Sequence, residues 1–148
     1  MFSKFREFYL EFSVLMNHFQ SFSLLFVRLA LAYGFYEPAL TKWSNFSATV
    51  EWFSELGIPF ASLFTFFTAS FEIVAVLLLT LGLFTRFISI PLMSIMLGAI
   101  IFVHIENGFA IAENGFEIPL YYFIFLGILL SRGAGKFSLD FLFFGRDR

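Results

Sequence analysis

Two ionisable side chains interrupt long apolar stretches of this sequence. Arg28 lies near the middle of residues 21–36, and Glu72 lies near the middle of residues 58–81. A charge at the centre of a membrane helix costs about 2.5 to 3.5 kcal/mol on insertion scales, so it usually has a partner or a function. If the two stretches are neighbouring antiparallel helices, both side chains reach a similar depth, and we predict that they pair. The pair would belong to a proton path or buried site, or it would be an ion pair that fixes helix register.

A second group of reactive side chains lies at or near those ends of the apolar stretches that a four-span topology places on the outer side of the membrane. It contains Glu37, Lys42, Trp43, His104 and Glu117. Together they predict a pocket at the level of the lipid headgroups that takes a quinone. His104 would exchange a proton with a quinone carbonyl or hydroxyl, Lys42 would stabilise a reduced anion, and Trp43 or Trp52 would stack on the ring. The alternative is that the Trp and Lys side chains are ordinary interfacial anchors.

Metal and haem chemistry compete with this interpretation, but the residue types do not favour them. The chain has no Cys, which excludes disulfides, iron–sulfur ligation and thiol chemistry of its own. His104 with Glu106, Glu113 or Glu117 offers nitrogen and oxygen ligands, yet no helical His pair completes a tight zinc site. His18, the other His, is expected a membrane thickness away, so the two cannot share one haem iron. We therefore predict no metal site and no covalent cofactor.

The composition indicates the solvent in which these residues are placed. Hydrophobic residues make up 59% of the 148 residues, charged residues 14%, and the mean hydropathy is +0.87. A water-soluble domain carries roughly 25% charged residues. The formal net charge of -2 gives no basic excess for a phosphate backbone, so we expect no nucleic-acid partner. Lipid is the solvent that this composition fits.

Four apolar stretches are long enough, or nearly so, to cross a bilayer, which takes about 20 residues. They are residues 21–36, 58–81, 87–104 and 118–131. Glu37–Pro38 is predicted to end the first of them, because proline lacks the backbone N–H that continues a helix. No alternation typical of barrel strands occurs, so the stretches predict helices. The expected fold is an all-α transmembrane four-helix bundle.

The N-terminal residues 1–20 differ from the four stretches. Phenylalanines recur there at helical spacing with charged residues between them, which predicts an amphipathic helix on the inner membrane surface rather than a cleavable signal peptide. Residues 141–144 are predicted to be a second, shorter piece of this kind. No internal repeat or linker divides the chain, so residues 1–148 are expected to form one domain.

Lysine and arginine positions predict the orientation, because cytoplasmic flanks retain positive residues. In a four-span topology the Lys and Arg residues outside the spans fall on one side, with Lys42 as the exception. The loop over residues 105–117 is acidic and contains no Lys or Arg. We therefore expect a multi-pass protein of the cell inner membrane with both termini in the cytoplasm.

Several short motifs occur in a characteristic order over roughly residues 22–140. They are Arg28–Leu29, Lys42–Trp43, Leu56–Pro59, Glu72, Leu81–Arg86, His104 and Gly135–Asp140. With this order and spacing the sequence resembles the DoxX family of small four-helix integral membrane proteins. It departs from the family pattern at Lys136 and Phe137, where Arg and Tyr are more usual. The resemblance implies a subunit of a thiosulfate:quinone oxidoreductase, a membrane partner of thiol and oxidative-stress enzymes, or an association with metal-responsive gene clusters.

Three functions are therefore compared with the structure. The first is a quinone-associated subunit or partner of a membrane oxidoreductase system, whose redox centre lies in another protein; the chain by itself is not expected to be an autonomous enzyme. The second is a transporter or metal-handling factor, and the third is a structural anchor for a partner enzyme. An apolar cleft between helices would favour the first, a polar cavity open to one side the second, and a filled bundle the third. Lipid and a partner protein or second copy are the expected partners.

Overall fold

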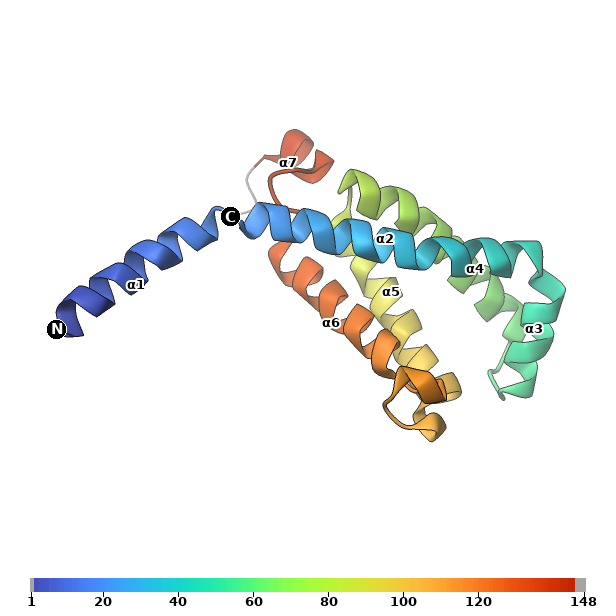
Figure 1. Cartoon of the computed structure of the whole chain (residues 1–148). Helices are drawn as coiled ribbons and strands as arrows, with labels where there is room; N and C mark the ends of the chain where they lie inside the picture. The colour runs from blue at the N-terminus through green and yellow to red at the C-terminus, as the bar shows by residue number, and fades with distance from the viewer. Residues whose placement is uncertain (1, 146–148) are drawn as a thin grey trace.

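The protein is helical throughout the part of the chain that its structure, a computed structural model, describes, which is residues 2–145 (Figure 1). No strand occurs in these residues, so the all-α prediction is confirmed. A π-helix, Ile100–His104, continues α5, and two short 3-10 turns, Ile105–Asn107 and Ile111–Glu113, follow it. The α-helices are α1 (Phe2–Asn17), α2 (Gln20–Ser44), α3 (Phe46–Glu55), α4 (Ala61–Leu81), α5 (Thr85–Ala99), α6 (Glu117–Arg132) and α7 (Leu139–Phe144).

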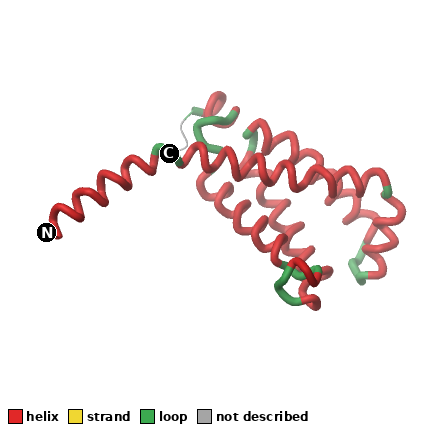
Figure 2. Tube along the Cα trace, viewed as in Figure 1, coloured by secondary structure: helices red, strands yellow, loops and turns green. Residues whose placement is uncertain are grey.

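Two antiparallel helix pairs form the body of the molecule. Helix α2 packs along α4, and α5 packs along α6 (Figures 1 and 2). The pairs meet at the end where α7 lies and diverge toward the end where α3 lies. Helix α1 projects from the body as an arm. Because the described residues contain helices beyond these four, the narrower four-helix bundle stays a prediction.

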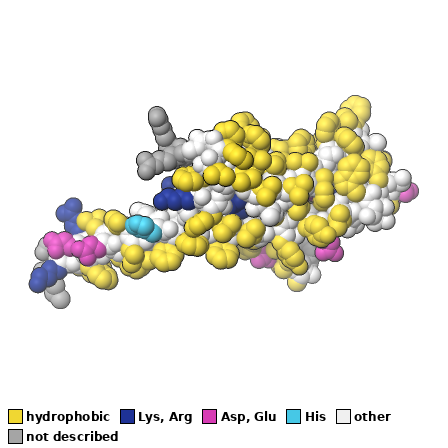
Figure 3. Space-filling view, turned by 90° about the horizontal axis from the view of Figure 1, so that it is seen from above, with side chains coloured by type: hydrophobic (Ala, Val, Ile, Leu, Met, Phe, Trp, Pro, Cys, Tyr) yellow, Lys and Arg dark blue, Asp and Glu magenta, His cyan; other side chains and the backbone are white. Residues whose placement is uncertain are grey.

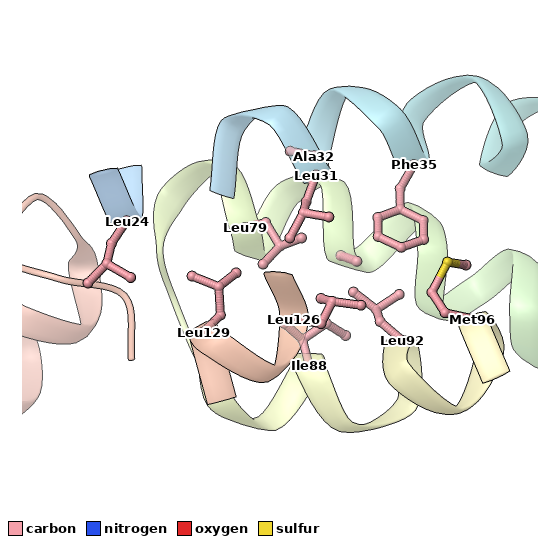
Figure 4. Packing of buried hydrophobic residues seen from close by; sticks show 11 residues of the cluster. Leu24, Leu31, Ala32, Phe35, Leu79, Ile88, Leu92, Met96, Leu126 and Leu129 are labelled. Carbon is pink, nitrogen blue, oxygen red and sulfur yellow. The ribbon is translucent and has the colours of Figure 1, made fainter. Parts of the chain in front are cut away.

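The core lies where the two pairs meet. Leu31 from α2, Leu79 from α4, Ile88 from α5, and Leu126 and Leu129 from α6 are buried there against one another (Figure 4). In lipid the hydrophobic effect does not drive helices together, so close packing of such side chains supplies the attraction. This contact fixes one end of the body and leaves the other end open.

Helix α2 is longer than the sequence predicts. The prediction that Glu37–Pro38 ends the helix is wrong, because α2 continues through Pro38 to Ser44. Membrane helices tolerate proline where neighbouring helices support the interrupted turn. Because Pro38 has no backbone N–H, the Gly34 carbonyl does not receive its usual helical hydrogen bond. Gly34 also has no Cβ, and the Tyr122 side chain of α6 occupies the space that a Cβ would take. The continuation matters because it places Lys42 on a helix rather than in a loop.

The helices differ in their ability to cross a membrane. Among the described residues, α4 and the continuous helical stretch Thr85–Asn107 are long and apolar enough to cross one. Helices α1 and α2 join at a bend of 45° and would count as a third span if the bent pair is one span. Helix α6 has 16 residues. Four spans therefore stay a prediction.

The outer surface of the body is largely apolar. Hydrophobic side chains cover most of the face seen in Figure 3, and charged side chains gather on the α1 arm. The phenylalanines of α1, including Phe5, Phe8 and Phe12, are exposed, as are Leu142, Phe143 and Phe144 in and around the last turn of α7. The helices expected at residues 1–20 and 141–144 are thus present, and their position on a membrane surface stays a prediction.

Candidate functional site

A cavity of about 760 Å³ lies between the two helix pairs at their open end. Helices α2, α3, α4, α5 and α6 and the π-helix all contribute to its wall. Pockets of roughly 300 to 1,000 Å³ with mostly apolar walls are typical sites for small organic molecules. The aromatic side chains of the wall are Phe35, Trp52, Phe53, Phe64, Phe67, Phe71, Phe102 and Tyr122.

Helix α4 contributes a stripe of phenylalanines to this wall. Phe64, Phe67 and Phe71 recur at spacings of three and four residues, which places them on one face of the helix. The rings of Phe67 and Phe71 stack with centroids 6.3 Å apart. Glu72 is the residue that follows this stripe. An acidic group therefore stands at the end of a wall otherwise suited to an apolar ligand.

Glu72 forms an ion pair with Lys42 inside the cavity. Lys42 Nζ donates to both carboxylate oxygens of Glu72, at 2.8 Å to Oε2 and 3.1 Å to Oε1. The Glu72 side chain is 3% exposed and the Lys42 side chain 17%. Both residues line the cavity. The pair neutralises two charges that would each be costly in a low-dielectric surrounding.

The predicted pairing of Arg28 with Glu72 is wrong. Glu72 gives both oxygens to Lys42, and Arg28 Nη1 donates instead to the backbone carbonyl of Leu79 at 3.0 Å. Helices α2 and α4 are antiparallel with a register that sets Arg28 level with Leu79, which lies about 10 Å along the axis from Glu72. The prediction rested on each residue lying near the middle of its apolar stretch, and this estimate of depth does not distinguish positions two helical turns apart.

Arg28 occupies the closed end of the body and does not line the cavity. It is fully buried, and its Nη2 donates to the carbonyl of Phe137 in the segment that leads to α7. The guanidinium lies against Gly82, and a Cβ at that position would overlap it. Gly82 also has a positive φ of 66°, a conformation that glycine adopts without strain. Arg28 thus joins α2, the end of α4 and the segment before α7.

Asp140 takes part in the same contact, which we call the joint and which consists of Arg28, Gly82, Phe137 and Asp140. Its carboxylate accepts hydrogen bonds from the backbone N–H groups of Phe84 at 2.7 Å and Thr85 at 3.0 Å, and so caps the start of α5. Its own N–H donates to the Gly82 carbonyl at 2.9 Å. The carboxylate also acts electrostatically on Arg28. Two motifs far apart in the sequence, residues 81–86 and 135–140, therefore serve one structural contact.

His104 lies at the rim of the cavity, where the π-helix ends. Its Nδ1 is 2.7 Å from the carbonyl oxygen of Asn114, another lining residue. A carbonyl only accepts, so Nδ1 carries a proton, and in the neutral ring Nε2 has the free lone pair. π-Helices occur frequently at functional sites. The Asn114 carbonyl thus holds the His104 ring through Nδ1.

Like Arg28, three residues of the predicted outer group lie outside the cavity wall, namely Glu37, Trp43 and Glu117. The Glu117 carboxylate accepts a hydrogen bond from the N–H of Ile111 at 3.1 Å and so holds the loop before α6. Trp43 packs edge-on against Phe66, with ring centroids 5.9 Å apart. The tryptophan of the wall is Trp52. Of the predicted outer group, the structure brings together Lys42 and His104, with Trp52 in place of Trp43.

Comparison with known proteins adds the family. The sequence model of the DoxX family matches residues 23–105. This range runs from the first turn of α2 through the π-helix and includes Lys42, Glu72 and His104. The chain belongs to the DoxX family. This DoxX protein is 34% identical over 128 residues to an uncharacterized protein of Haemophilus influenzae, with 81% of this chain and 82% of the relative covered. No solved structure matches it.

Tyr122 is a cavity residue of this DoxX protein that the sequence did not single out. It lines the cavity, and its ring packs edge-on against Phe35 with centroids 5.4 Å apart. The available signal was a phenol hydroxyl inside an apolar stretch, at residue 122 of the predicted span 118–131. Three further tyrosines, Tyr33, Tyr36 and Tyr121, carry the same signal and do not line the cavity, so type and position alone do not select Tyr122.

The acidic residues near His104 do not gather around it. Within residues 2–145, no group of three His, Asp or Glu side chains is arranged to hold a metal ion. The nitrogen and oxygen ligands that the sequence offers at His104, Glu106, Glu113 and Glu117 are therefore not assembled into one cluster in this DoxX protein.

Proposed function

We propose that this DoxX protein binds a lipophilic molecule of the quinone class and acts as a quinone-associated subunit or partner of a membrane oxidoreductase system. One observation carries the proposal: a large cavity with aromatic walls contains a buried Lys42–Glu72 pair and has His104 at its rim. A quinone combines an apolar ring and tail with carbonyl oxygens that accept hydrogen bonds. Both halves of such a molecule find matching groups here.

Each polar group has a distinct role in this proposal. Lys42 donates to a carbonyl oxygen of the ring, and the Trp52 indole provides a surface on which the ring stacks. His104 exchanges a proton with the ring oxygen through Nε2, since Nδ1 is held by Asn114. In this proposal the electrons come from a redox centre on a partner protein. This chain contributes binding, orientation and proton exchange.

The cavity also bears on the two alternatives. A purely structural anchor needs no internal space, whereas about 760 Å³ is kept open between these helices. A transporter of metal ions or polar solutes needs a series of polar groups, and here the wall is mainly aromatic and aliphatic. The quinone-class ligand is the occupant that this wall favours.

We further propose four spans: α2, α4, α5 with its π-helix, and α6. The distribution of Lys and Arg supports cytoplasmic termini, with α7 and the Arg28 joint on the inner side and the acidic residues 105–117 on the outer side. The cavity then lies in the outer half of the membrane. A lipophilic ligand reaches it from the outer leaflet.

Tryptophan fluorescence tests the binding site directly. The chain has two tryptophans, and Trp43→Phe leaves Trp52 in the cavity wall as the reporter. Titration of purified Trp43→Phe protein with decylubiquinone should quench the fluorescence saturably. Trp52→Phe protein, which keeps Trp43, is the matched control and should show only weak, non-saturating quenching.

Two results of the same titration would contradict the proposal. One is the absence of saturable quenching in Trp43→Phe protein. The other is equal quenching in both variants, which would indicate general partitioning into the detergent or lipid. His104→Ala and Lys42→Met in the Trp43→Phe background then show whether the polar lining contributes, with Lys42→Met expected to weaken binding about tenfold.

A further inference from the structure

We infer that the cavity selects ligands with an uncharged oxygen headgroup and rejects carboxylate amphiphiles such as fatty acids, and that Glu72 is the residue that makes this selection. The inference deepens the proposed function and rests on it for the identity of the site. It concerns which of several amphiphiles of similar apolar shape enters the cavity. A membrane protein meets all of them at once, so shape alone does not discriminate.

The ammonium group of Lys42 has hydrogen-bonding capacity left over. A lysine ammonium carries three N–H donors. Two directions are taken by Glu72 Oε1 and Oε2, at 3.1 and 2.8 Å. The third N–H is left for an acceptor in the cavity, and the Lys42 side chain is the more exposed member of the pair. A ketone, quinone, ester or phenol oxygen satisfies it.

Charge decides between these acceptors and a carboxylate. Among the described residues of the wall, the acidic and basic side chains are Lys42, Glu72 and His104. Lys42 and Glu72 neutralise each other, so an uncharged oxygen meets no net charge. A carboxylate bound to Lys42 would lie close to the Glu72 carboxylate, and few waters would screen the repulsion at this depth.

Within residues 2–145, no other buried Lys or Arg side chain lines the cavity to compensate for that repulsion. Arg28, which is fully buried, is held by backbone carbonyls at the closed end and is not part of the wall. His104 is on the π-helix that continues α5, not on α2 or α4, and its Nδ1 is hydrogen-bonded to the Asn114 carbonyl. The single positive charge available to a deeply bound ligand is therefore already shared with Glu72. Unpaired like charge is a common means of rejecting a wrong ligand.

Replacement of Glu72 by glutamine isolates this effect. Glu72→Gln keeps the size of the side chain and an oxygen that accepts from Lys42, but it removes the negative charge. Lys42 then becomes an unneutralised cation in the wall, and carboxylate binding should increase. Thr68→Val is the matched control on the same face of α4, because Thr68 lines the cavity but its hydroxyl donates to the Thr65 carbonyl at 3.1 Å.

The experiment compares two probes with identical tails. Dibrominated stearate and its methyl ester both quench a nearby indole, and they differ in headgroup charge at a pH where the acid is ionised. With Trp52 as reporter in Trp43→Phe protein, the ester should bind about tenfold or more tightly than the acid. Glu72→Gln should abolish or reverse this preference, and Thr68→Val should retain it. Trp52→Phe protein corrects for quenching from the surrounding detergent.

The outcomes separate this inference from the proposed function. Equal binding of acid and ester by protein with native Glu72 overturns the charge selection even if decylubiquinone binds, and this arm does not depend on the folding of any Glu72 variant. Failure of the ester to quench Trp52 saturably overturns it as well. Selective binding of the ester without any decylubiquinone binding would instead support the selection and contradict the quinone ligand.

Discussion

At the scale of single residues, Glu72 and Lys42 determine the character of the site. Glu72 is almost completely buried in an apolar helix, and Lys42 reaches it from the last turn of α2. Each charge is tolerated because the other is present, since removal of one member of a buried pair leaves a charge without a partner. The pair therefore contributes both to folding and to the polarity of the cavity.

A double-mutant cycle tests this coupling. Lys42→Met and Glu72→Leu should each lower stability by about 3 to 5 kcal/mol, because each leaves one uncompensated charge in the body. The double variant should lose less than the sum of the two. The purified proteins are heated to a series of temperatures, and the amount of folded protein that remains is measured by size-exclusion chromatography. The resulting unfolding curves give the losses of stability. Independent, additive losses would show that the two residues act separately.

At the scale of the elements, the joint at the closed end holds the helix pairs in register. Arg28 ties α2 to the end of α4 and to the segment before α7, and Asp140 caps α5 from the first turn of α7. Gly82 lies between them with a positive φ. Because the pairs are fixed at this end, they can diverge at the other end without separating. The cavity depends on this arrangement.

A matched pair of glycine substitutions tests the joint. Gly82→Ala should lower the melting temperature clearly, because its Cβ overlaps Arg28 and its φ of 66° is strained for alanine, a cost of about 1 to 2 kcal/mol from backbone strain alone. Gly98→Ala adds a Cβ where no atom lies within 4 Å, and alanine favours helix by about 1 kcal/mol. It should therefore leave the melting temperature unchanged or raise it. Equal melting temperatures for the two variants would contradict the role of the joint.

At the scale of the whole molecule, the two ends of the body differ, and the orientation of the protein in the membrane decides which side each end faces. The segment before α7 and α7 itself lie at one end of the body, and the loop over residues 105–117 lies at the other (Figure 1). His104, which lines the cavity, ends the π-helix that leads into this loop. In the topology proposed above, the positive residues near α7 and at the start of the chain favour a cytoplasmic position for the joint. Ligand exchange is then expected in the outer leaflet.

Single-cysteine labelling tests this orientation, since the chain has no cysteine of its own. Glu106→Cys and Lys136→Cys place thiols at exposed positions on the two ends of the body. An impermeant maleimide should label Glu106→Cys on intact cells and Lys136→Cys after the membrane is opened. Labelling of both on intact cells would contradict the four-span topology with cytoplasmic termini.

The sequence by itself determines the class of this protein and the approximate positions of α4 and α5. Hydropathy over about 20 residues is a local property, so α4 and α5 could be predicted without knowing their neighbours. The cost of a charge in an apolar stretch is local as well, and it identifies Glu72 and Arg28 as residues that need partners. Residue type identifies Lys42 and His104 as candidates in the same way.

Only the tertiary structure decides which partner each of these residues has. The register of α2 against α4, and the continuation of α2 through Pro38, pair Glu72 with Lys42 and send Arg28 to backbone carbonyls two turns away. A register depends on the packing of many side chains at once, and spacing along one helix does not contain it. The cavity has the same origin, because it exists where the two helix pairs diverge. The assembled helices also decide that Trp52 lines the cavity and that Trp43 lies outside it.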